Sequence, residues 1–303
     1  MSELLKNRKD TPILSVCSAS KSFGNVRALD DISFDVFPGE LVGVLGENGA
    51  GKSTLFSLIS GLNTPTSGSV ELMGGDPRQP KNRRNIGVTP QGTGVNPRMR
   101  VGDFLNFVAF HFGTRSLVEE ILEKFRLEHL STKVIGGLSG GQQRLVSVAA
   151  AFLADAPLTI LDEPTTGLDA VTRSAIWESI RTITGSERAL LVSSHYIEEI
   201  ENLCDRVIVM RKGKLLADSD IQEFLGKSTA SVIRLSGVGR SALSGEGQVF
   251  EIIECEGKDL KLRAPDVKRA LAALAKDGWP FEQIEISHPS LEQAFITMTA
   301  EKK

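Results

Sequence analysis

Apolar residues along this chain fall into short runs of the kind that form buried strands. Residues 41–45 and 158–161 are almost continuously apolar, whereas residues 32–36 alternate between apolar and polar. Continuous runs are typical of strands covered on both faces, and alternation is typical of strands covered on one face. Helical patterns separate several of these runs. The sequence therefore predicts an α/β fold, a sheet with flanking helices.

Between about residues 92 and 154, apolar residues recur with the period of an α-helix. Helices are predicted at 103–112, 117–125 and 141–154, and we interpret the stretch as a helical lobe inserted into the sheet-bearing core. The first of these helices carries four phenylalanines, which one helical stripe cannot bury together. Two interpretations of that helix stay open, a core helix or a docking surface for another protein.

A second, smaller unit follows residue 225. Strands are predicted at 232–235, 249–253 and 260–262, and a helix starts after Asp266. The sequence thus predicts two domains. The first spans residues 11–225 and contains the helical lobe, and the second is a small α+β domain over residues 226–303 without a chemical motif of its own.

Composition narrows the classes of partner. The 303 residues are 41% hydrophobic and 24% charged, which suffices for a proper core. A net charge of -3 gives no general attraction to nucleic acid, so none is expected as a partner. Three widely spaced cysteines argue against a disulfide framework or a zinc site and favour a reducing cytosol. Apolar runs are too short to cross a bilayer, so a membrane role requires a partner with spanning helices.

The residues 46–54 carry the strongest chemical signal. Their sequence, Gly-Glu-Asn-Gly-Ala-Gly-Lys-Ser-Thr, matches the phosphate-binding loop pattern of two glycines followed by Lys and Ser or Thr. A buried strand precedes the loop and a helix follows it, which places the loop at the positive end of a helix dipole. Lys52 is then expected to reach the β and γ phosphates of a nucleotide, and the Ser53 hydroxyl to bind Mg²⁺.

Polar residues stand at the ends of three further predicted strands. Gln91 follows the strand at 86–89, Asp162 and Glu163 end the strand at 158–162, and His195 follows the strand at 189–194. In doubly wound sheets, ligands lie beyond the carboxyl ends of the strands. These side chains are therefore expected to converge on the loop at 46–54.

A pentapeptide at 138–142, Leu-Ser-Gly-Gly-Gln, completes a set of motifs. Together with residues 46–54 and 158–163, it makes residues 13–225 resemble the ATP-binding subunit of an ABC transporter. The resemblance implies a P-loop NTPase core of the ABC type, a mixed β-sheet with flanking helices and an inserted helical lobe. Arg100 departs from this family's pattern, which has a capping Thr there, so the sequence leaves open how the helix after it begins.

The resemblance also implies roles for individual residues, with ATP and Mg²⁺ as cofactors. Glu163 is the expected general base, helped by Lys52, Gln91 and His195, and the metal set is Ser53, Gln91 and Asp162. Phe23, in a predicted exposed loop over residues 21–26, is the expected adenine-stacking ring, although the family more often has Tyr there. The implied nucleotide-binding set is Phe23, Gly46, Glu47, Asn48, Gly49, Ala50, Gly51, Lys52, Ser53, Thr54, Ser139, Gly140, Gly141, Gln142 and Asp169.

Partners follow from the same resemblance. The family forms head-to-tail dimers in which residues 139–142 of one chain cover the ATP held by the other, so a homodimer or heterodimer is expected. Residues 290–299 resemble the closing helix of bacterial exporter ATPases that pair with a separate permease. The expected function is therefore ATP hydrolysis that drives export, at the cytoplasmic face of the cell membrane. The alternative is a soluble ABC-type ATPase that acts on a non-membrane complex.

Overall fold

The computed structural model describes residues 11–89, 96–228, 231–238, 243, 249–276, 278, 281–287, 291, 292, 294 and 295. The chain divides into two compact units, Met1–Asp220 and Ile221–Lys303. The first unit contains two sheets and the second unit contains one, and each unit has its own hydrophobic core. Within the described residues, no helix has the length and apolar character needed to span a bilayer.

A three-stranded antiparallel sheet opens the first unit, in the order β2-β1-β4. Its strands are β1 (Leu14–Phe23), β2 (Val26–Val36) and β4 (Ser67–Leu72). The prediction of a loop over residues 21–26 is wrong, because β1 continues to Phe23, which pairs directly with Val26. Gly24, at φ +56°, provides the left-handed conformation that this tight turn requires.

The larger sheet of the first unit has six strands in the order β5-β6-β7-β3-β8-β9. They are parallel from β5 to β8, and β9 joins β8 as an antiparallel hairpin. This places the carboxyl ends of β3, β6 and β7 at one edge, where the polar residues follow. The strands are β3 (Leu41–Gly46), β5 (Ile86–Val88), β6 (Leu158–Asp162), β7 (Ala189–Ser193), β8 (Arg206–Arg211) and β9 (Lys214–Asp220).

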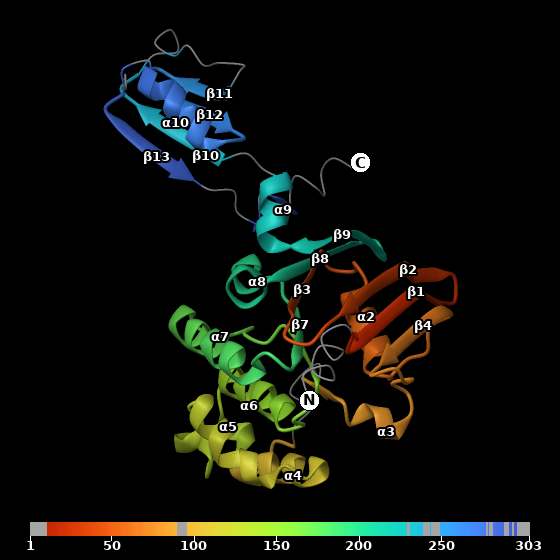
Figure 1. Cartoon of the computed structure of the whole chain (residues 1–303). Coiled ribbons are helices and arrows are strands. Elements are labelled where there is room, and N and C mark those ends of the chain that lie inside the picture. The colour runs from red at the N-terminus through yellow and green to blue at the C-terminus, as the bar shows by residue number, and fades with distance from the viewer. Residues whose placement is uncertain are drawn as a thin grey trace, which may run out of the picture. The chain divides into compact units, whose positions relative to one another are not determined.

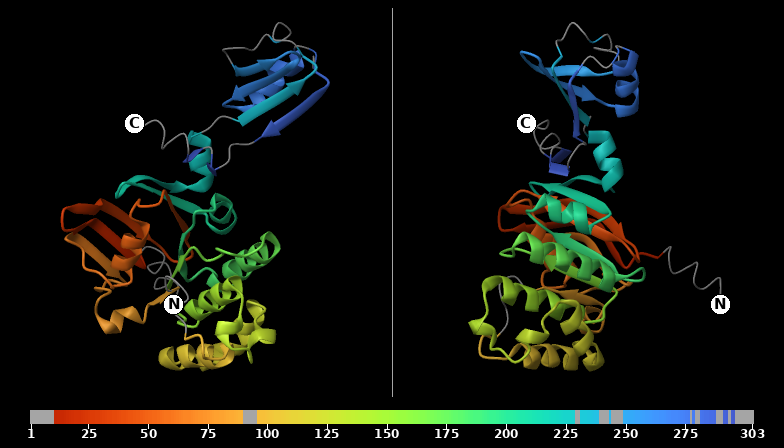
Figure 2. Two further views of the ribbon diagram at one scale, coloured as in Figure 1. Left: turned by 180° about the vertical axis from the view of Figure 1, so that it is seen from behind. Right: turned by 90° about the vertical axis from the view of Figure 1, so that its left-hand side faces the viewer.

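Helices cover both faces of this six-stranded sheet (Figures 1 and 2). Helix α2 (Lys52–Ile59) shares a core cluster with residues of both sheets, and Val42 and Val44 of β3 point into that cluster. Gly43 faces the other way, where a Cβ atom would lie 2.4 Å from Ile200 of α8 (Ile197–Leu203). The long helix α7 (Ala170–Thr184) packs beside α8.

A group of helices lies at the lower end of the first unit in Figure 1. It contains α4 (Val101–Phe112), α5 (Val118–Lys124) and α6 (Gly140–Phe152), joined by the short 3-10 turns η1 (Arg115–Leu117), η2 (Glu128–Leu130) and η3 (Ile135–Gly137). A further short helix, α3 (Pro80–Arg83), precedes β5. Helix α6 leads from this group back into the sheet at β6.

The start of α4 answers the question left by Arg100. The Arg100 side chain does not cap the helix. Instead, the N–H groups of Val101 and Gly102 donate to the backbone oxygens of Lys133 and Ser131, at 3.0 and 2.8 Å. A neighbouring loop thus satisfies amide groups that a capping threonine would otherwise have satisfied.

The second unit is a four-stranded antiparallel sheet covered by one helix (Figure 1). Buried residues alternate along β10 and β12 and pack with Ala270 and Leu274 of α10 into a separate core. Of the expected helix at 290–299, residues 291, 292, 294 and 295 are described and are helical, and the remaining residues lie outside the described part of the chain. The elements are α9 (Ile221–Ser228), β10 (Ser231–Ser236), β11 (Glu251–Glu256), β12 (Asp259–Ala264), α10 (Val267–Lys276) and β13 (Gln283–Ser287).

Candidate nucleotide-binding site

The loop between β3 and α2 has the backbone of an anion-binding turn. Gly49 and Gly51 adopt φ values of +82° and +106°, which side-chain-bearing residues rarely adopt. A Cβ atom on Gly51 would also lie 2.8 Å from the backbone oxygen of Ala28. No side chain caps the start of α2. The first amide groups of the helix are therefore available to an anion.

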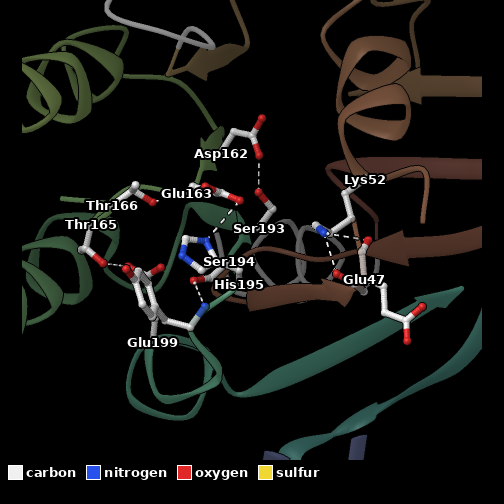
Figure 3. Close-up of polar contacts among 12 residues, drawn as sticks. Glu47, Lys52, Asp162, Glu163, Thr165, Thr166, Ser193, Ser194, His195 and Glu199 are labelled. Atoms are coloured by element: carbon white, nitrogen blue, oxygen red, sulfur yellow. Dashed lines mark hydrogen bonds and ion pairs between the residues drawn. The ribbon is translucent and has the colours of Figure 1, made fainter. Parts of the chain in front are cut away.

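Lys52 supplies the mobile positive charge at this loop. Its Nζ donates to the backbone oxygens of Gly46 at 2.6 Å and Glu47 at 3.4 Å, as Figure 3 shows. Burial lowers the pKa of Lys52, and the nearby carboxylates of Glu163 and Asp162 oppose that shift. A phosphate at the loop would also favour the protonated amine.

The ends of β6 and β7 bring together two of the predicted catalytic side chains, Glu163 and His195, and the predicted metal ligand Asp162 (Figure 3). The Asp162 carboxylate accepts a hydrogen bond from the Ser193 hydroxyl of β7. Glu163 Oε1 lies 3.3 Å from His195 Nδ1, with both side chains about two-fifths exposed. Parallel pairing of the two strands explains this, because Asp162 is opposite Ser193 and the next residues emerge at the same edge.

Backbone contacts fix the position of Glu163. Its N–H donates to the backbone oxygen of Ser193 at 2.9 Å, and its φ of +52° is uncommon for a residue with a side chain. Arg144 of α6 donates from Nε to the backbone oxygen of Glu163 at 3.1 Å and also donates to that of Asp162. The Thr166 hydroxyl donates to Glu163 Oε2 at 3.3 Å. Contacts from α6 and β7 thus fix the backbone of Glu163, and Thr166 in the following loop contacts its carboxylate.

A cleft of about 1010 Å³ joins these groups. Its lining includes residues 48–54, Asp162 and Glu163, together with Ser139, Gly140 and Gly141. The cationic side chains of Arg27, Lys52, Arg144 and Lys212 also border it. Main-chain N–H groups and cations suit a polyphosphate, and the Ser53 hydroxyl with the Asp162 carboxylate provides oxygen ligands of the kind Mg²⁺ prefers. The residues present fit a magnesium nucleotide.

Residues 139–142 of the Leu-Ser-Gly-Gly-Gln pentapeptide form the start of α6. Ser139 and Gln142 make a reciprocal capping box, with the Gln142 N–H donating to Ser139 Oγ at 3.2 Å and the Ser139 N–H donating to Gln142 Oε1 at 3.1 Å. Gln142 and Asp169 line a second, smaller hollow of about 400 Å³. Asp169 caps α7 through Thr172, and these hydrogen bonds lower the pKa of its carboxyl.

Some predicted site residues lie away from the main cleft. Phe23 is half exposed at the β1–β2 turn, with Lys21 Nζ 5.0 Å from its ring centre, and the cleft lining begins only at Val26. Gln91 lies outside the described residues. Gly46 does not line the cleft but accepts the hydrogen bond from Lys52.

Several residues that the motifs did not single out belong to the site. Arg144 and Thr166 hold Glu163, and Ser193 holds Asp162. The turn at Lys212 and Gly213 supports the phosphate loop, because the Gly213 N–H donates to the Ala50 oxygen at 3.0 Å. The sequence signal for Arg144 is its charge in an otherwise uncharged helix, whereas the sequence at 212–213 predicts only a hairpin turn.

Comparison with known proteins adds independent support. Residues 29–166 match the family model described as ABC transporter. The chain is 32% identical over 300 residues to the Nod factor export ATP-binding protein I of Mesorhizobium japonicum, covering 95% of this chain and 87% of the relative. A protein of the same name from Rhizobium sp. (strain N33) is 32% identical over 298 residues, covering 94% and 96% of the two chains.

Solved structures show the same fold. One described as the ATP binding subunit of an ABC transporter superposes with a TM-score of 0.65 at 27% identity, covering 70% of this chain and 91% of its own. A dimeric ATP-binding cassette in a post-hydrolysis state, bound to ADP and Pi, superposes with a TM-score of 0.62 over 69% of this chain and 98% of its own. At 24% identity, the second likeness concerns the fold alone.

Proposed function

This chain belongs to the ATP-binding subunits of ABC transporters, and we propose that it hydrolyses MgATP to drive export through a separate membrane permease, at the cytoplasmic face of the cell membrane. Export is supported by relatives that are named for it and that align with nearly the whole chain. The observation that carries the proposal is the convergence of the phosphate loop, Asp162, Glu163 and His195 at one edge of the sheet.

In this proposal, the loop at 46–54 and Lys52 bind the phosphates of ATP. Ser53 and Asp162 hold Mg²⁺, with Gln91 as a third contact, and the metal neutralises phosphate charge when bound. Phe23 stacks on adenine at the entrance. The hydrogen bond from Ser193 keeps the Asp162 carboxylate directed toward the cleft.

Glu163 is the proposed general base. Its carboxylate accepts the proton of the attacking water, since it lies at the cleft wall, receives a hydrogen bond from Thr166 and is carried by a backbone that Arg144 and Ser193 fix. His195 lies 3.3 Å from it and donates to the γ-phosphate. Both groups are partly exposed in the isolated chain, so closure of the site must exclude water.

A second ATP-binding subunit is the proposed source of that closure. Ser139, Gly140 and Gly141 place the start of α6, the positive end of its dipole, at the cleft. In a head-to-tail dimer of identical or related subunits, this helix start and Asp169 cover the nucleotide bound by the other subunit. A solved cassette of the same fold is described as dimeric after hydrolysis, which agrees with this arrangement.

The permease is proposed to contact the outer side of α4. This helix buries Val101, Leu105 and Ala109, spaced four residues apart, and leaves Phe107 and Phe110 64% and 63% exposed. Two large aromatic side chains in water are unfavourable unless a partner covers them. A cytoplasmic segment of the permease is the partner that the function requires.

Substitution of the proposed base tests both chemistry and dimerisation. Glu163→Gln keeps the shape and the contact with Thr166 but accepts a proton poorly, so we expect the ATPase rate of the purified chain to fall about 100-fold or more. ATP should then hold the variant as a dimer that elutes at twice the mass in size exclusion. Glu187→Gln, an exposed carboxylate before β7, is the matched control and should behave like the parent.

Two results would contradict the proposal. Hydrolysis by Glu163→Gln at the rate of the parent would show that Glu163 is not the base. A variant that binds ATP yet stays monomeric at every protein concentration would show that the site is not shared between two subunits.

A further inference from the structure

A carboxylate with no exposed surface lies behind the candidate site. Glu199, in the first turn of α8, has a relative exposure of 0%, whereas its neighbours Glu198 and Glu201 are exposed. Carboxylates are seldom buried completely unless hydrogen bonds or charges compensate for the lost hydration. Glu199 therefore needs a structural explanation beyond the amphipathic pattern of its helix.

The Glu199 carboxylate joins two segments that are distant in sequence. Its Oε1 atom accepts hydrogen bonds from Thr165 Oγ at 2.6 Å and from Trp177 Nε1 at 3.1 Å. Thr165 lies two residues after Glu163, and Trp177 belongs to α7. Both donors are themselves buried, with exposures of 1% and 6%. Without Glu199 they have no water within reach, so the acceptor is required to keep them in place.

The other proposed catalytic residue is tied to Glu199 as well. Helix α8 starts two residues after His195, and the Glu199 N–H donates to the backbone oxygen of Tyr196, the residue after His195, at 3.1 Å. The Tyr196 N–H in turn donates to the hydroxyl of Ser194, the residue before His195, at 2.9 Å. The segments that carry Glu163 and His195 thus meet at Glu199 on the side away from the cleft.

Both neutral hydrogen-bond donors and charged groups surround Glu199. Burial raises the pKa of the carboxyl, while the hydrogen bonds that it accepts and the charge of Arg173 act in the opposite direction. The Arg173 guanidinium lies 4.9 Å from the ring centre of Tyr196 and 6.0 Å from that of Trp177. Glu199 therefore acts mainly as a hydrogen-bond acceptor and less as a member of an ion pair.

We propose that Glu199 is a positioning residue for ATP hydrolysis, which holds the loop of Glu163 in register with the helix that follows His195 through its hydrogen bonds with Thr165 and Trp177. This inference rests on the proposed roles of Glu163 and His195. A displacement of about 1 Å at a reacting group costs on the order of 100-fold in rate, so a small relaxation behind the site is enough to slow catalysis.

Two substitutions at Glu199 separate positioning from mere filling of space. Glu199→Gln keeps an oxygen that accepts from Thr165 and Trp177, whereas Glu199→Met keeps the volume but accepts nothing. We expect the Gln variant to retain kcat within about twofold of the parent. We expect the Met variant to lose about 10- to 100-fold in kcat with an unchanged KM for ATP, because Lys52 and its loop are untouched.

Substitutions at Thr165 test the same contact from its other end and do not remove the carboxylate. Thr165→Val should lower kcat in the same way, and Thr165→Ser should restore it. The double variant Glu199→Met, Thr165→Val should be no slower than Glu199→Met alone, since both remove one shared interaction. Glu198→Gln, one residue earlier on the exposed side of α8, is the control and should match the parent.

Parent kcat in Glu199→Met and Thr165→Val, with only thermal stability changed, would overturn the proposal, and so would a kcat loss in Glu199→Gln as large as in Glu199→Met. Failure of the proposed function looks different. In that case the parent chain turns over no MgATP, or Glu163→Gln leaves its rate unchanged, whatever happens at Glu199.

Discussion

Two glutamates near the site differ in their contact with water. Glu163 is 38% exposed and borders the cleft, whereas Glu199 is completely buried behind it. A general base must be accessible to a water molecule. The partners of a positioning group must instead be shielded from water, which would compete for their hydrogen bonds. The difference in burial therefore assigns the two carboxylates to different tasks, and it also makes Glu199 sensitive to pH.

The pKa of Glu199 predicts how the variant Glu199→Gln changes stability with pH. Because burial raises the pKa above the ordinary 4.5, the protonated carboxyl favours the folded state below about pH 4.5. That stabilisation is lost as the pH rises through the folded-state pKa. Glutamine does not titrate, so we expect Glu199→Gln to gain stability relative to the parent between about pH 4.5 and neutrality, measured by urea unfolding.

Other titratable groups interact electrostatically with Glu199, namely Arg173 on α7, Arg144 on α6 and Cys204 after α8. Guanidinium and thiol groups do not titrate between about pH 4.5 and neutrality, so a stability difference that changes over this range reports on Glu199. A stability difference that stays constant across the pH range, or that falls as the pH rises, would contradict the prediction.

At the scale of single elements, hydrophobic periodicity predicted where helices and strands lie better than it predicted which side chains they bury. The runs at 41–45 and 158–162 became β3 and β6, and the Gly-rich loop leads into α2 as predicted. In α4, the pattern did not decide which phenylalanines are buried, because Leu105 and Ala109 compete for the same core. The structure resolves this in favour of the small and aliphatic residues, with Phe107 and Phe110 outside.

The exposed phenylalanines of α4 predict a selective loss of permease binding. We expect Phe107→Ser with Phe110→Ser to leave the ATPase rate of the isolated chain unchanged and to cost about 0.5 kcal/mol in stability, mainly from the contact between Phe110 and Arg115 at 4.5 Å. Co-purification of the chain with its multi-helix membrane partner in detergent should fail. Leu62→Ser, at an exposed leucine after α2, is the control and should still bind.

Retention of the membrane partner by the double phenylalanine variant would move the permease contact elsewhere on the subunit. Loss of the ATPase rate of the isolated variant would show instead that α4 supports the nucleotide site.

At the scale of the whole molecule, local motifs predicted residues of the candidate site but not the residues that hold them in place. Lys52, Asp162, Glu163 and His195 stand in recognisable patterns, because phosphate chemistry needs those residue types at strand ends. Their supports come from distant parts of the chain. The hydrogen bond from Thr165 to Glu199 spans 34 residues and that from Arg144 to Glu163 spans 19, and no sequence period indicates either contact.

The two hydrophobic cores predict two unfolding transitions. One cluster joins residues from Ile13 to Met210, and a separate cluster joins residues from Ile233 to Leu274. Only the first unit carries the candidate nucleotide site, so MgADP at about 100 times its Kd should stabilise that unit by about 2.7 kcal/mol. In scanning calorimetry, one transition should then rise by about 5–10 °C while the other stays in place. Lys52→Ala should abolish the shift without moving the second transition, whereas a single transition that shifts as a whole would mean that the two units unfold as one cooperative body.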